Sequence, residues 1–440
     1  MKRLLKGGRV VDPANGLDGR FDVLVEDGVI ARVEANLPAP DGDVQVIDVP
    51  AGLVICPGLV DMHVHLREPG QEHKETIATG TRSAVAGGFT AVACMPNTSP
   101  VNDNAGITQF ILQKAAEAGL ARVYPIGAVS RGSNGEFLAD IAELHAAGCA
   151  AISDDGRPVA TALLMRRALE YASMFDIVVI DHCEDPSLKG DGVAHEGFHA
   201  SALGLRGLPG AAETIMVQRD VTLAGLTGGR VHIAHMSARG SLRAVRDGKA
   251  QGFPVTCEVA PHHFVLTDES LREPIQFDTN CKMNPPLREQ ADVDAMIQGI
   301  VDGSVDAIAT DHAPHHADEK GVEFDRAPFG IVGLETCVPI VLDRLVHPGL
   351  ITLSRAIELL STNPARILRR PGGTLSPGQP ADITVLAPDA RVAIVPGQLV
   401  SKSKNTPFGG WTFRGAAAAT IVGGRTVFTN PGVAGAAAFA

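Results

Sequence analysis

Two histidines near the start of the chain have the spacing of metal ligands. His63 and His65 close the apolar run LVDMHVH. A spacing of two residues places both imidazoles on one side of a strand. From there the pair can chelate Zn²⁺ or a similar ion. Packing alone could also explain a single H-x-H pair, so the pair needs further ligands elsewhere in the chain to indicate a metal site.

Four more polar residues follow later apolar runs in the same way: Asp155 in SDDG, His182 in VVIDHCED, His235 in VHIAHMS and Asp311 in AIATDHAPHH. D-D-G is also turn chemistry, so the residues alone do not decide between a turn and a ligand. A lone histidine at such a position is more often a packing residue. Four sites at the same place in successive repeats are not independent, and with the H-x-H pair they suit a two-metal site with a bridging carboxylate.

Asp311 has a possible role in proton transfer besides that of a ligand. A metal ion lowers the pKa of the water bound to it toward neutrality. A nearby carboxylate can take the proton of that water and pass it to a leaving group. The residues therefore predict a metal-dependent hydrolase. His262 and His263 point in opposite directions if they lie on a strand, and we assign them a structural role.

The apolar runs predict the fold that positions these residues. Eight short runs between residues 56 and 370 alternate with stretches of helical spacing, such as 75–88, 161–174 and 291–303. Eight β/α repeats predict a (β/α)8 TIM-type barrel, and the polar residues then gather at its C-terminal face, where barrels build catalysis. A doubly wound sheet is the alternative, but it usually carries a glycine fingerprint that this chain lacks.

The two ends of the chain differ from the middle. Residues 1–55 and the stretch from about residue 375 have strand–turn–strand patterns, with an E-D-G turn signal at 26–28. We therefore expect a hydrolase barrel over 56–370. Residues 1–55 and 371–440 would pair into a small β-sandwich domain.

Composition narrows the class of protein. A hydrophobic fraction of 45% with 20% charged residues is ordinary for a soluble globular chain of 440 residues. A net charge of −12 argues against binding to nucleic acid or an anionic membrane. No apolar run has the length of a membrane span. Seven Cys without a C-x-x-C pair predict reduced thiols in a cytoplasmic protein.

Longer motifs resemble one family. HVHLREPG, MPNT, SDDG, HCED, DTNCKMNPPLR, ATDHAPH and SKSKNTPF are similar to those of bacterial dihydroorotases of the longer, amidohydrolase-barrel class. The H-x-H pair and the last Asp are shared across amidohydrolases, whereas HLREPG and DTNCKMNPPLR are more specific. The resemblance covers nearly the whole chain. It implies reversible cyclisation of N-carbamoyl-L-aspartate to L-dihydroorotate in pyrimidine biosynthesis.

The resemblance also implies roles for single residues. The metal ligands would be His63, His65, Asp155, His182, His235 and Asp311. They would hold two Zn²⁺ ions bridged by Asp155 and a hydroxide, with Asp311 as general base and acid. The choice of Asp155 over Asp154 rests on the family spacing to His182. Substrate contacts would come from His65, Arg67, Asn97, Asn280, His315, Phe329 and Gly330.

Arg67 is the local cation that an anionic substrate needs in an acidic protein, because its planar fork suits a carboxylate. The structural alternative is that Arg67 pairs with Glu68 or another loop acid. The long polar segment 312–330 after Asp311 is predicted to be a lid.

Two other functions remain open. A hydantoinase or allantoinase would use a neutral ring, and it usually has a carboxylated Lys at the bridge, where CAAISDDGRPV offers only acids. A metal-free structural partner of aspartate transcarbamoylase would have lost ligands. We expect a homodimer. An association of the active enzyme with aspartate transcarbamoylase stays open.

Overall fold

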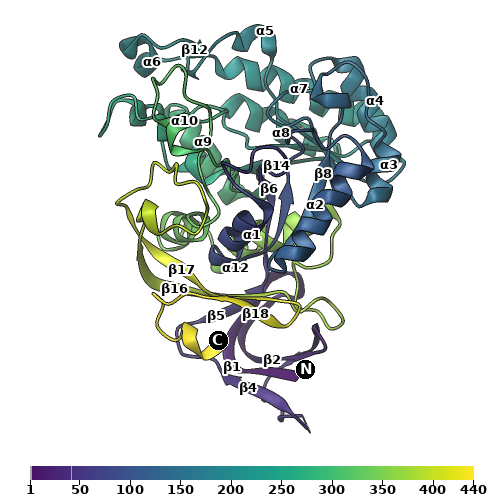
Figure 1. Ribbon diagram of the computed structural model, residues 1–440, viewed down its shortest axis with the longest axis vertical. Helices are drawn as coiled ribbons and strands as arrows, with labels where there is room; N and C mark the ends of the chain where they lie inside the picture. The colour runs from purple at the N-terminus through teal and green to yellow at the C-terminus, as the bar shows by residue number, and fades with distance from the viewer. Residues whose placement is uncertain (1, 41) are drawn as a thin grey trace.

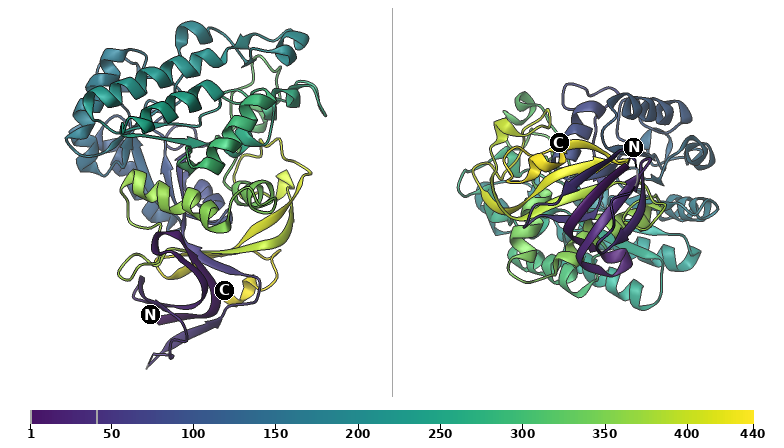
Figure 2. Two further views of the ribbon diagram at one scale, coloured as in Figure 1. Left: turned by 180° about the vertical axis from the view of Figure 1, so that it is seen from behind. Right: turned by 90° about the horizontal axis from the view of Figure 1, so that it is seen from below.

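The computed structural model describes residues 2–40 and 42–440 of the protein. The chain forms a large helix-rich body and a smaller β-rich body below it (Figure 1). Both the N-terminal and the C-terminal segments run into the smaller body, where the two termini lie (Figures 1 and 2). None of the described helices is long and apolar enough to cross a membrane.

Eight parallel strands build the large body, hydrogen-bonded in the order β15-β14-β13-β10-β9-β8-β7-β6. A parallel bridge from Val64 to His312 brings the end of the first strand against the segment after the last, so the barrel nearly closes. All eight apolar runs contain a strand, which confirms the (β/α)8 prediction. The strands are β6 Leu59–Val64, β7 Phe89–Cys94, β8 Arg122–Gly127, β9 Ala151–Ile152, β10 Val178–Asp181, β13 Val231–Ile233, β14 Val255–Val259 and β15 Ala307–Ile308.

Helices surround the outside of these strands (Figure 2), and every residue of β6, β7 and β10 is buried, so both faces of these strands are covered. This double burial explains why the strands appear as continuous apolar runs rather than alternating ones. The three expected helical stretches are α1, α4 and α9. The helices are α1 Ile77–Ala86, α2 Ala105–Ala118, α3 Ile141–Ala147, α4 Ala162–Ser173, α5 Pro186–Lys189, α6 Phe198–Leu203, α7 Gly210–Thr227, α8 Arg239–Ala250, α9 Gln290–Asp302, α10 Ala317–Lys320, α11 Cys337–Val341, α12 Leu353–Ile357 and α13 Asn363–Leu368.

Local sequence sets the helix starts. Thr76 forms a capping box with Thr79 before α1, and the Thr161 hydroxyl accepts the Leu164 N–H before α4. These caps satisfy backbone donors that have no partner within the helix. Both helices therefore begin at a polar cap. The residues between the end of the preceding strand and this cap remain free to carry side chains of the site.

Strands from both ends of the chain join in one eight-stranded sheet, in the order β18-β17-β16-β5-β1-β2-β3, with β4 paired to β1. The E-D-G turn joins β2 to β3 as expected, with Asp27 and Gly28 both at positive φ. β5 pairs with β1 on one side and with β16 on the other, so it joins the two halves. The bounds are β1 Lys2–Asp12, β2 Leu17–Glu26, β3 Val29–Glu34, β4 Val44–Asp48, β5 Val54–Pro57, β16 Ile383–Ala393, β17 Thr412–Val422 and β18 Arg425–Thr429.

Two features complete the fold. β11 (Ala194–His195) and β12 (Gly207–Leu208) form a two-stranded sheet that the sequence did not predict, because two-residue strands carry no periodic pattern. All seven Cys are buried and unpaired, in agreement with the prediction of reduced thiols.

Candidate active site

The six predicted ligands meet at the C-terminal ends of the barrel strands. His63 belongs to β6, and the other five follow β6, β9, β10, β13 and β15 within a few residues. Parallel strands end at one rim of a barrel, so residues far apart in the chain become neighbours there. All six side chains are buried; they are His63, His65, Asp155, His182, His235 and Asp311.

The Asp155 carboxylate lies at the centre of the cluster. Its Oδ1 is 3.3 Å from His63 Nε2, 3.7 Å from His182 Nδ1 and 3.5 Å from His235 Nε2. Its Oδ2 is 3.5 Å from His65 Nε2. The two oxygens of this carboxylate therefore face different imidazoles.

The neighbouring acid, Asp154, points elsewhere. Its Oδ1 accepts the Ser130 N–H at 3.0 Å and its Oδ2 accepts the Ser130 hydroxyl at 2.5 Å. Of the two acids that the sequence left open, Asp155 is the one in the cluster. Gly156 has φ of +83°, so D-D-G is a turn as well as the source of a candidate ligand.

Asp311 closes the other side of the cluster. Its Oδ1 lies 3.2 Å from His65 Nε2 and 3.6 Å from His63 Nε2. Burial alone would raise the pKa of this carboxyl, but His63 and His65 hold it below its ordinary value. Asp311 is therefore ionised at neutral pH in this setting and can accept a proton.

The donor atoms fit a metal. Two sets of ligand atoms, from His63, Asp155 and His235 and from His63, His65 and Asp311, each lie within 4.8 Å of one another. His63 Nε2 and Asp155 Oδ1 are buried but have no hydrogen-bond partner among the described residues. Unsatisfied buried polar atoms cost free energy, which a cation between them would recover.

The pKa shifts of the cluster residues also agree with a bound cation. Burial would lower the pKa of His63, but Asp155 and Asp311 hold it well above its ordinary value. Burial would raise the pKa of Asp155, but His63, His182 and His235 hold it well below its ordinary value. The carboxylates are thus charged, and they supply the negative field that a divalent cation needs.

Glu258 on β14 supports the cluster from behind, and sequence reasoning missed it. Its Oε1 lies 2.8 Å from His63 Nδ1, and its Oε2 lies 3.2 Å from His232 Nε2. A carboxylate on the far nitrogen fixes the orientation and tautomer of a ligating imidazole. The signal was an acid inside the apolar run VTCEV, which has to have a buried partner.

Backbone strain also gathers at the site. Arg67, His235 and Asp311 have φ of 63°, 29° and 47°, in the left-handed region that residues other than Gly rarely adopt. Such positions cost about 1–3 kcal/mol each and cluster at functional sites. The fold therefore loses some folding free energy in order to orient these three side chains.

The cluster opens into a cavity of about 300 Å³, which is in the size range of small-molecule sites. Arg67, Asn97, His315 and Phe329 line it together with five of the six cluster residues, all except His63. Asn97 Oδ1 lies 2.9 Å from His65 Nδ1, so this residue contacts a predicted ligand as well as the cavity.

Arg67 is buried beside the cluster and has no carboxylate ion-pair partner in the part of the chain that the structure describes. Its Nε donates to the Pro314 carbonyl at 3.1 Å, and its Nη2 lies 3.3 Å from His315 Nε2. Glu68 instead accepts the Ile77 N–H, so it is not the partner of Arg67. Burial lowers the pKa of Arg67 to about 10, which still leaves it charged at neutral pH. The cavity thus holds a guanidinium that forms no ion pair with any carboxylate of residues 2–40 and 42–440.

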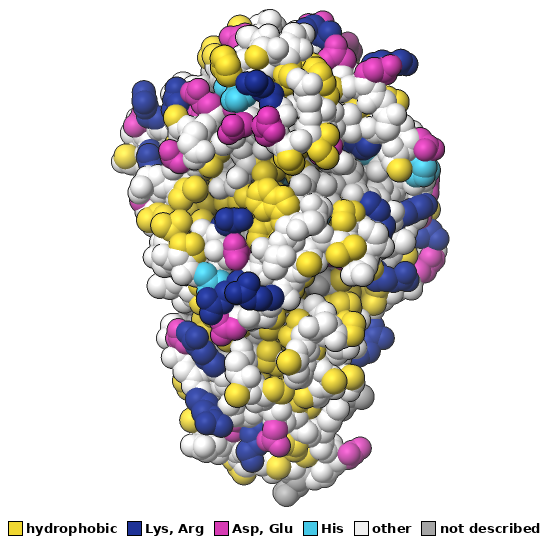
Figure 3. Space-filling view, turned by 90° about the vertical axis from the view of Figure 1, so that its left-hand side faces the viewer, with side chains coloured by type: hydrophobic (Ala, Val, Ile, Leu, Met, Phe, Trp, Pro, Cys, Tyr) yellow, Lys and Arg dark blue, Asp and Glu magenta, His cyan; other side chains and the backbone are white. Residues whose placement is uncertain are grey.

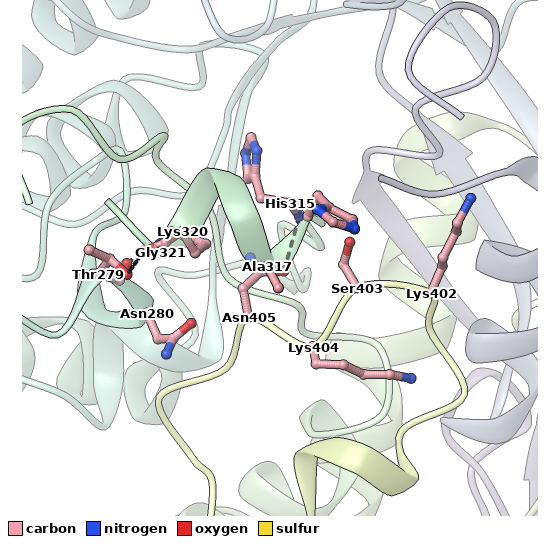
Figure 4. Close-up of a pocket in the computed structure, with 11 residues that line it drawn as sticks. Thr279, Asn280, His315, Ala317, Lys320, Gly321, Lys402, Ser403, Lys404 and Asn405 are labelled. Carbon is pink, nitrogen blue, oxygen red and sulfur yellow. Dashed lines mark hydrogen bonds between the residues drawn. The ribbon is translucent and has the colours of Figure 1, made fainter. Parts of the chain in front are cut away.

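A second cavity of about 400 Å³ lies next to the first and shares His315 with it. Figure 4 shows Asn280 on one side of this cavity and Ser403 and Lys402 on the other. The structure therefore separates Asn280 from Arg67 and Asn97, although the family resemblance implies that all three contact one substrate. His315 is the residue common to both cavities.

The loop 312–330 is tied to the turn at 279–282. Lys320 Nζ donates to the carbonyls of Thr279 and Pro328, both at 2.9 Å, and the Gly330 N–H donates to the Lys282 carbonyl at 2.9 Å. Burial lowers the pKa of Lys320 to about 7. These contacts hold Phe329 at the wall of the first cavity.

Asn405, in the closing motif SKSKNTPF, is a further residue that sequence reasoning did not single out. Its Nδ2 donates to the carbonyls of Ala313 and Gly330 at 3.0 and 2.9 Å, and its Oδ1 accepts the His315 N–H at 3.0 Å. It is buried. A side chain from the C-terminal segment therefore fixes both ends of the loop that carries His315, Phe329 and Gly330.

Replacing Asn405 with Ala should lower kcat/KM for the substrate by about 10- to 100-fold, because misplacing a binding group by about 1 Å has effects of that size. Metal content should stay at the parent level, since no cluster residue bonds to Asn405. Lys404→Ala is the matched control, because Lys404 is exposed and its Nζ donates to two carbonyls outside the loop 312–330, those of Leu399 and Ser401. Unchanged kinetics in Asn405→Ala would refute the positioning role.

Comparison with known proteins agrees with the site. A family model described as "Dihydro-orotase-like" matches residues 52–241, and one described as "Amidohydrolase family" matches residues 341–428. A protein named Dihydroorotase from Syntrophotalea carbinolica is 53% identical, over 97% of this chain and 99% of its own length. Another of that name, from Geobacter sulfurreducens, is 55% identical over 98% of this chain and 100% of its own.

Solved structures share the fold at lower identity. The L-hydantoinase (dihydropyrimidinase) from Arthrobacter aurescens superposes with a TM-score of 0.85 at 23% identity, covering 97% of this chain and 96% of that one. The dihydropyrimidinase from Brevibacillus agri gives 0.82 at 21% identity, covering 98% and 95%. These two show the barrel and its end domain, whereas the relatives at over half identity along the full length decide the family: the chain belongs to the dihydroorotases of the amidohydrolase superfamily.

Proposed function

We propose that this protein interconverts N-carbamoyl-L-aspartate and L-dihydroorotate, a step of pyrimidine biosynthesis. The observation that carries the proposal is the unpaired guanidinium of Arg67 beside the His/Asp cluster, in one cavity. A ring amide must reach the cluster while its carboxylate reaches a cation. Arg67 supplies that cation a short distance away.

Binding orients the ring by its carboxylate. Arg67 offers a planar fork for two charge-assisted hydrogen bonds, and Asn97 and His315 stand beside it in the cavity wall. Phe329 of the loop 312–330 lines the cavity, which fits the idea of a lid that limits the access of water. Gly330, which follows it, is proposed to contact the ring through its backbone. Asn280 would join these contacts only if the loop 312–330, whose His315 lines both cavities, moves.

Asp311 is proposed as the proton carrier. When the ring opens, it takes a proton from the attacking water and delivers it to the ring nitrogen that leaves; ring closure reverses both transfers. Bound metal would polarise the ring carbonyl and acidify water at the cluster. We propose zinc as the metal, because His and Asp ligands suit it. Two ions would be held by His63, His65, Asp155, His182, His235 and Asp311.

Removal of metal by a chelator should abolish ring opening, and added Zn²⁺ should restore it. The melting temperature should fall on removal, because a ligand that binds only the folded state stabilises it. Elemental analysis of the same samples gives the number of ions per chain. Full activity in metal-free protein would contradict the proposed chemistry.

A cyclic amidase for neutral rings is the second candidate, since the solved neighbours with this fold are named as hydantoinases and dihydropyrimidinases. The buried unpaired Arg67 disfavours it, because a neutral ring would leave that charge uncompensated. A metal-free partner of aspartate transcarbamoylase is disfavoured by the convergence of all six ligand positions.

For its assembly we propose a barrel unit, residues 56–370, carried by the end domain of residues 1–55 and 371–440, and a homodimer of the whole chain. Figure 3 shows hydrophobic side chains gathered in a band across the middle of one side, beside Lys and Arg. Exposed apolar patches often mark interfaces. Light scattering after size exclusion, alone and with aspartate transcarbamoylase, tests both associations.

A further inference from the structure

A cavity at the opposite end of the barrel collects arginines. It measures about 540 Å³ and is lined by Arg230, Arg366, Arg369 and Arg370, together with the Gly372–Gly373 turn. Arg230 directly precedes β13, whereas the candidate ligand His235 follows it. The cavity therefore lies away from the candidate active site, between the barrel and the end domain, which contributes Ala14.

The positive charge of this cavity is only partly compensated. Asp176 pairs with both Arg230 and Arg369. Among the described residues, the Arg366 side chain donates to the Asn363 side chain alone, and Arg370 donates to the carbonyls of Gly148 and Cys149. Within the described part of the chain, these four guanidinium groups thus share one carboxylate, in a protein of net charge −12.

A second carboxylate nearby, that of Asp12, is already satisfied. It accepts the N–H groups of Ala14 and Leu375 and the side-chain donors of Asn15 and Thr374. It therefore does not neutralise the arginines. The end of a helix such as α13 favours cations through its dipole, but that effect does not explain why Arg230, from another segment, lines the same cavity.

Residues that line this cavity also carry unused donors. Arg370 Nε is buried and has no hydrogen-bond partner among the described residues. The N–H groups of Gly372 and Gly373, both at positive φ, have no acceptor within the described part of the chain either. Backbone donors in a glycine turn beside arginines are the groups that bind phosphate in proteins.

We propose that this cavity binds a phosphate-bearing anion, held by the guanidinium forks and the glycine turn. The cavity is large enough for a small phosphorylated molecule as well as for the free ion. Its occupant would link Arg230, α13 and the glycine turn and so stabilise the junction of the barrel with the end domain. The activity proposed above does not require this site.

Calorimetric titration with inorganic phosphate, and in parallel with ribose 5-phosphate, tests the proposal. The active-site cavity also holds a cation, so each titration is run on the parent protein and on Arg67→Met. We expect saturable binding in both, and at least tenfold weaker binding in Arg366→Ala/Arg369→Ala with dihydroorotate turnover unchanged. Tighter binding of the sugar phosphate would assign the site to phosphorylated small molecules, and equal binding would assign it to the free ion.

The matched control is Arg82→Ala/Arg243→Ala, which removes the same charge from exposed positions on α1 and α8. It should bind phosphate like the parent. Three results would overturn the proposal: no saturable binding, binding lost in Arg67→Met but kept in Arg366→Ala/Arg369→Ala, or equal loss in the control pair.

Discussion

Replacing Asp311 with Asn is expected to lower kcat for dihydroorotate opening by about 10³- to 10⁴-fold, the upper range for a positioned proton carrier. Asn keeps the shape of the side chain but cannot accept a proton. Asp311 lines the cavity, and its Oδ1 is 3.2 Å from His65 Nε2. Among the described residues, Asp155 is the one other carboxylate in the cavity wall that could take its place.

The Asp311→Asn assay is run with metal in excess, and bound metal is measured in the same sample, so that loss of an ion is not mistaken for loss of the base. Asp318→Asn is the matched control, because Asp318 lies in the same loop and is 92% exposed. A metal-loaded Asp311→Asn protein with more than a tenth of the parent kcat would remove Asp311 from the proposed role.

Replacing Arg67 with Met should reduce kcat/KM for dihydroorotate by about 10²- to 10⁴-fold, because two hydrogen bonds to a charged group contribute about 1.5–3 kcal/mol each. Turnover of a neutral ring such as hydantoin should not fall. Arg67→Lys should recover only part of the loss, since an ammonium cannot make the planar two-point contact.

The same substitution should leave the melting temperature unchanged or raise it. Arg67 is buried and forms no ion pair with a carboxylate of the described residues, so the folded state carries the desolvation cost of its charge without compensation. Arg82→Met on the exposed surface of α1 is the control. A large fall in stability with equal losses on charged and neutral rings would mean that Arg67 serves packing rather than recognition.

Most of the cluster could be predicted from sequence because the barrel turns chain order into position. A polar residue after each apolar run must lie at the rim where parallel strands end. His63, His65, His182, His235 and Asp311 follow that rule. The choice between Asp154 and Asp155 could not be made from residue types, because both lie in one turn and only the observed contact of Asp154 with Ser130 separates them.

The supporting residues were harder to predict. Glu258 is a lone acid in a buried strand, and only the folded barrel places it against His63. Asn405 lies 90 residues beyond His315, whose loop it holds, so no local pattern links the two. The position of Asn280 in the neighbouring cavity also depends on how the loop 312–330 packs, which spacing does not encode.

Ring opening of L-dihydroorotate, a simple hydantoin and allantoin, measured in parallel with and without added Zn²⁺, tests the central claim most directly. We predict metal-dependent turnover of dihydroorotate and little or none of the two neutral rings. Turnover of the neutral rings in place of dihydroorotate would contradict the proposed role of Arg67 and the substrate with it.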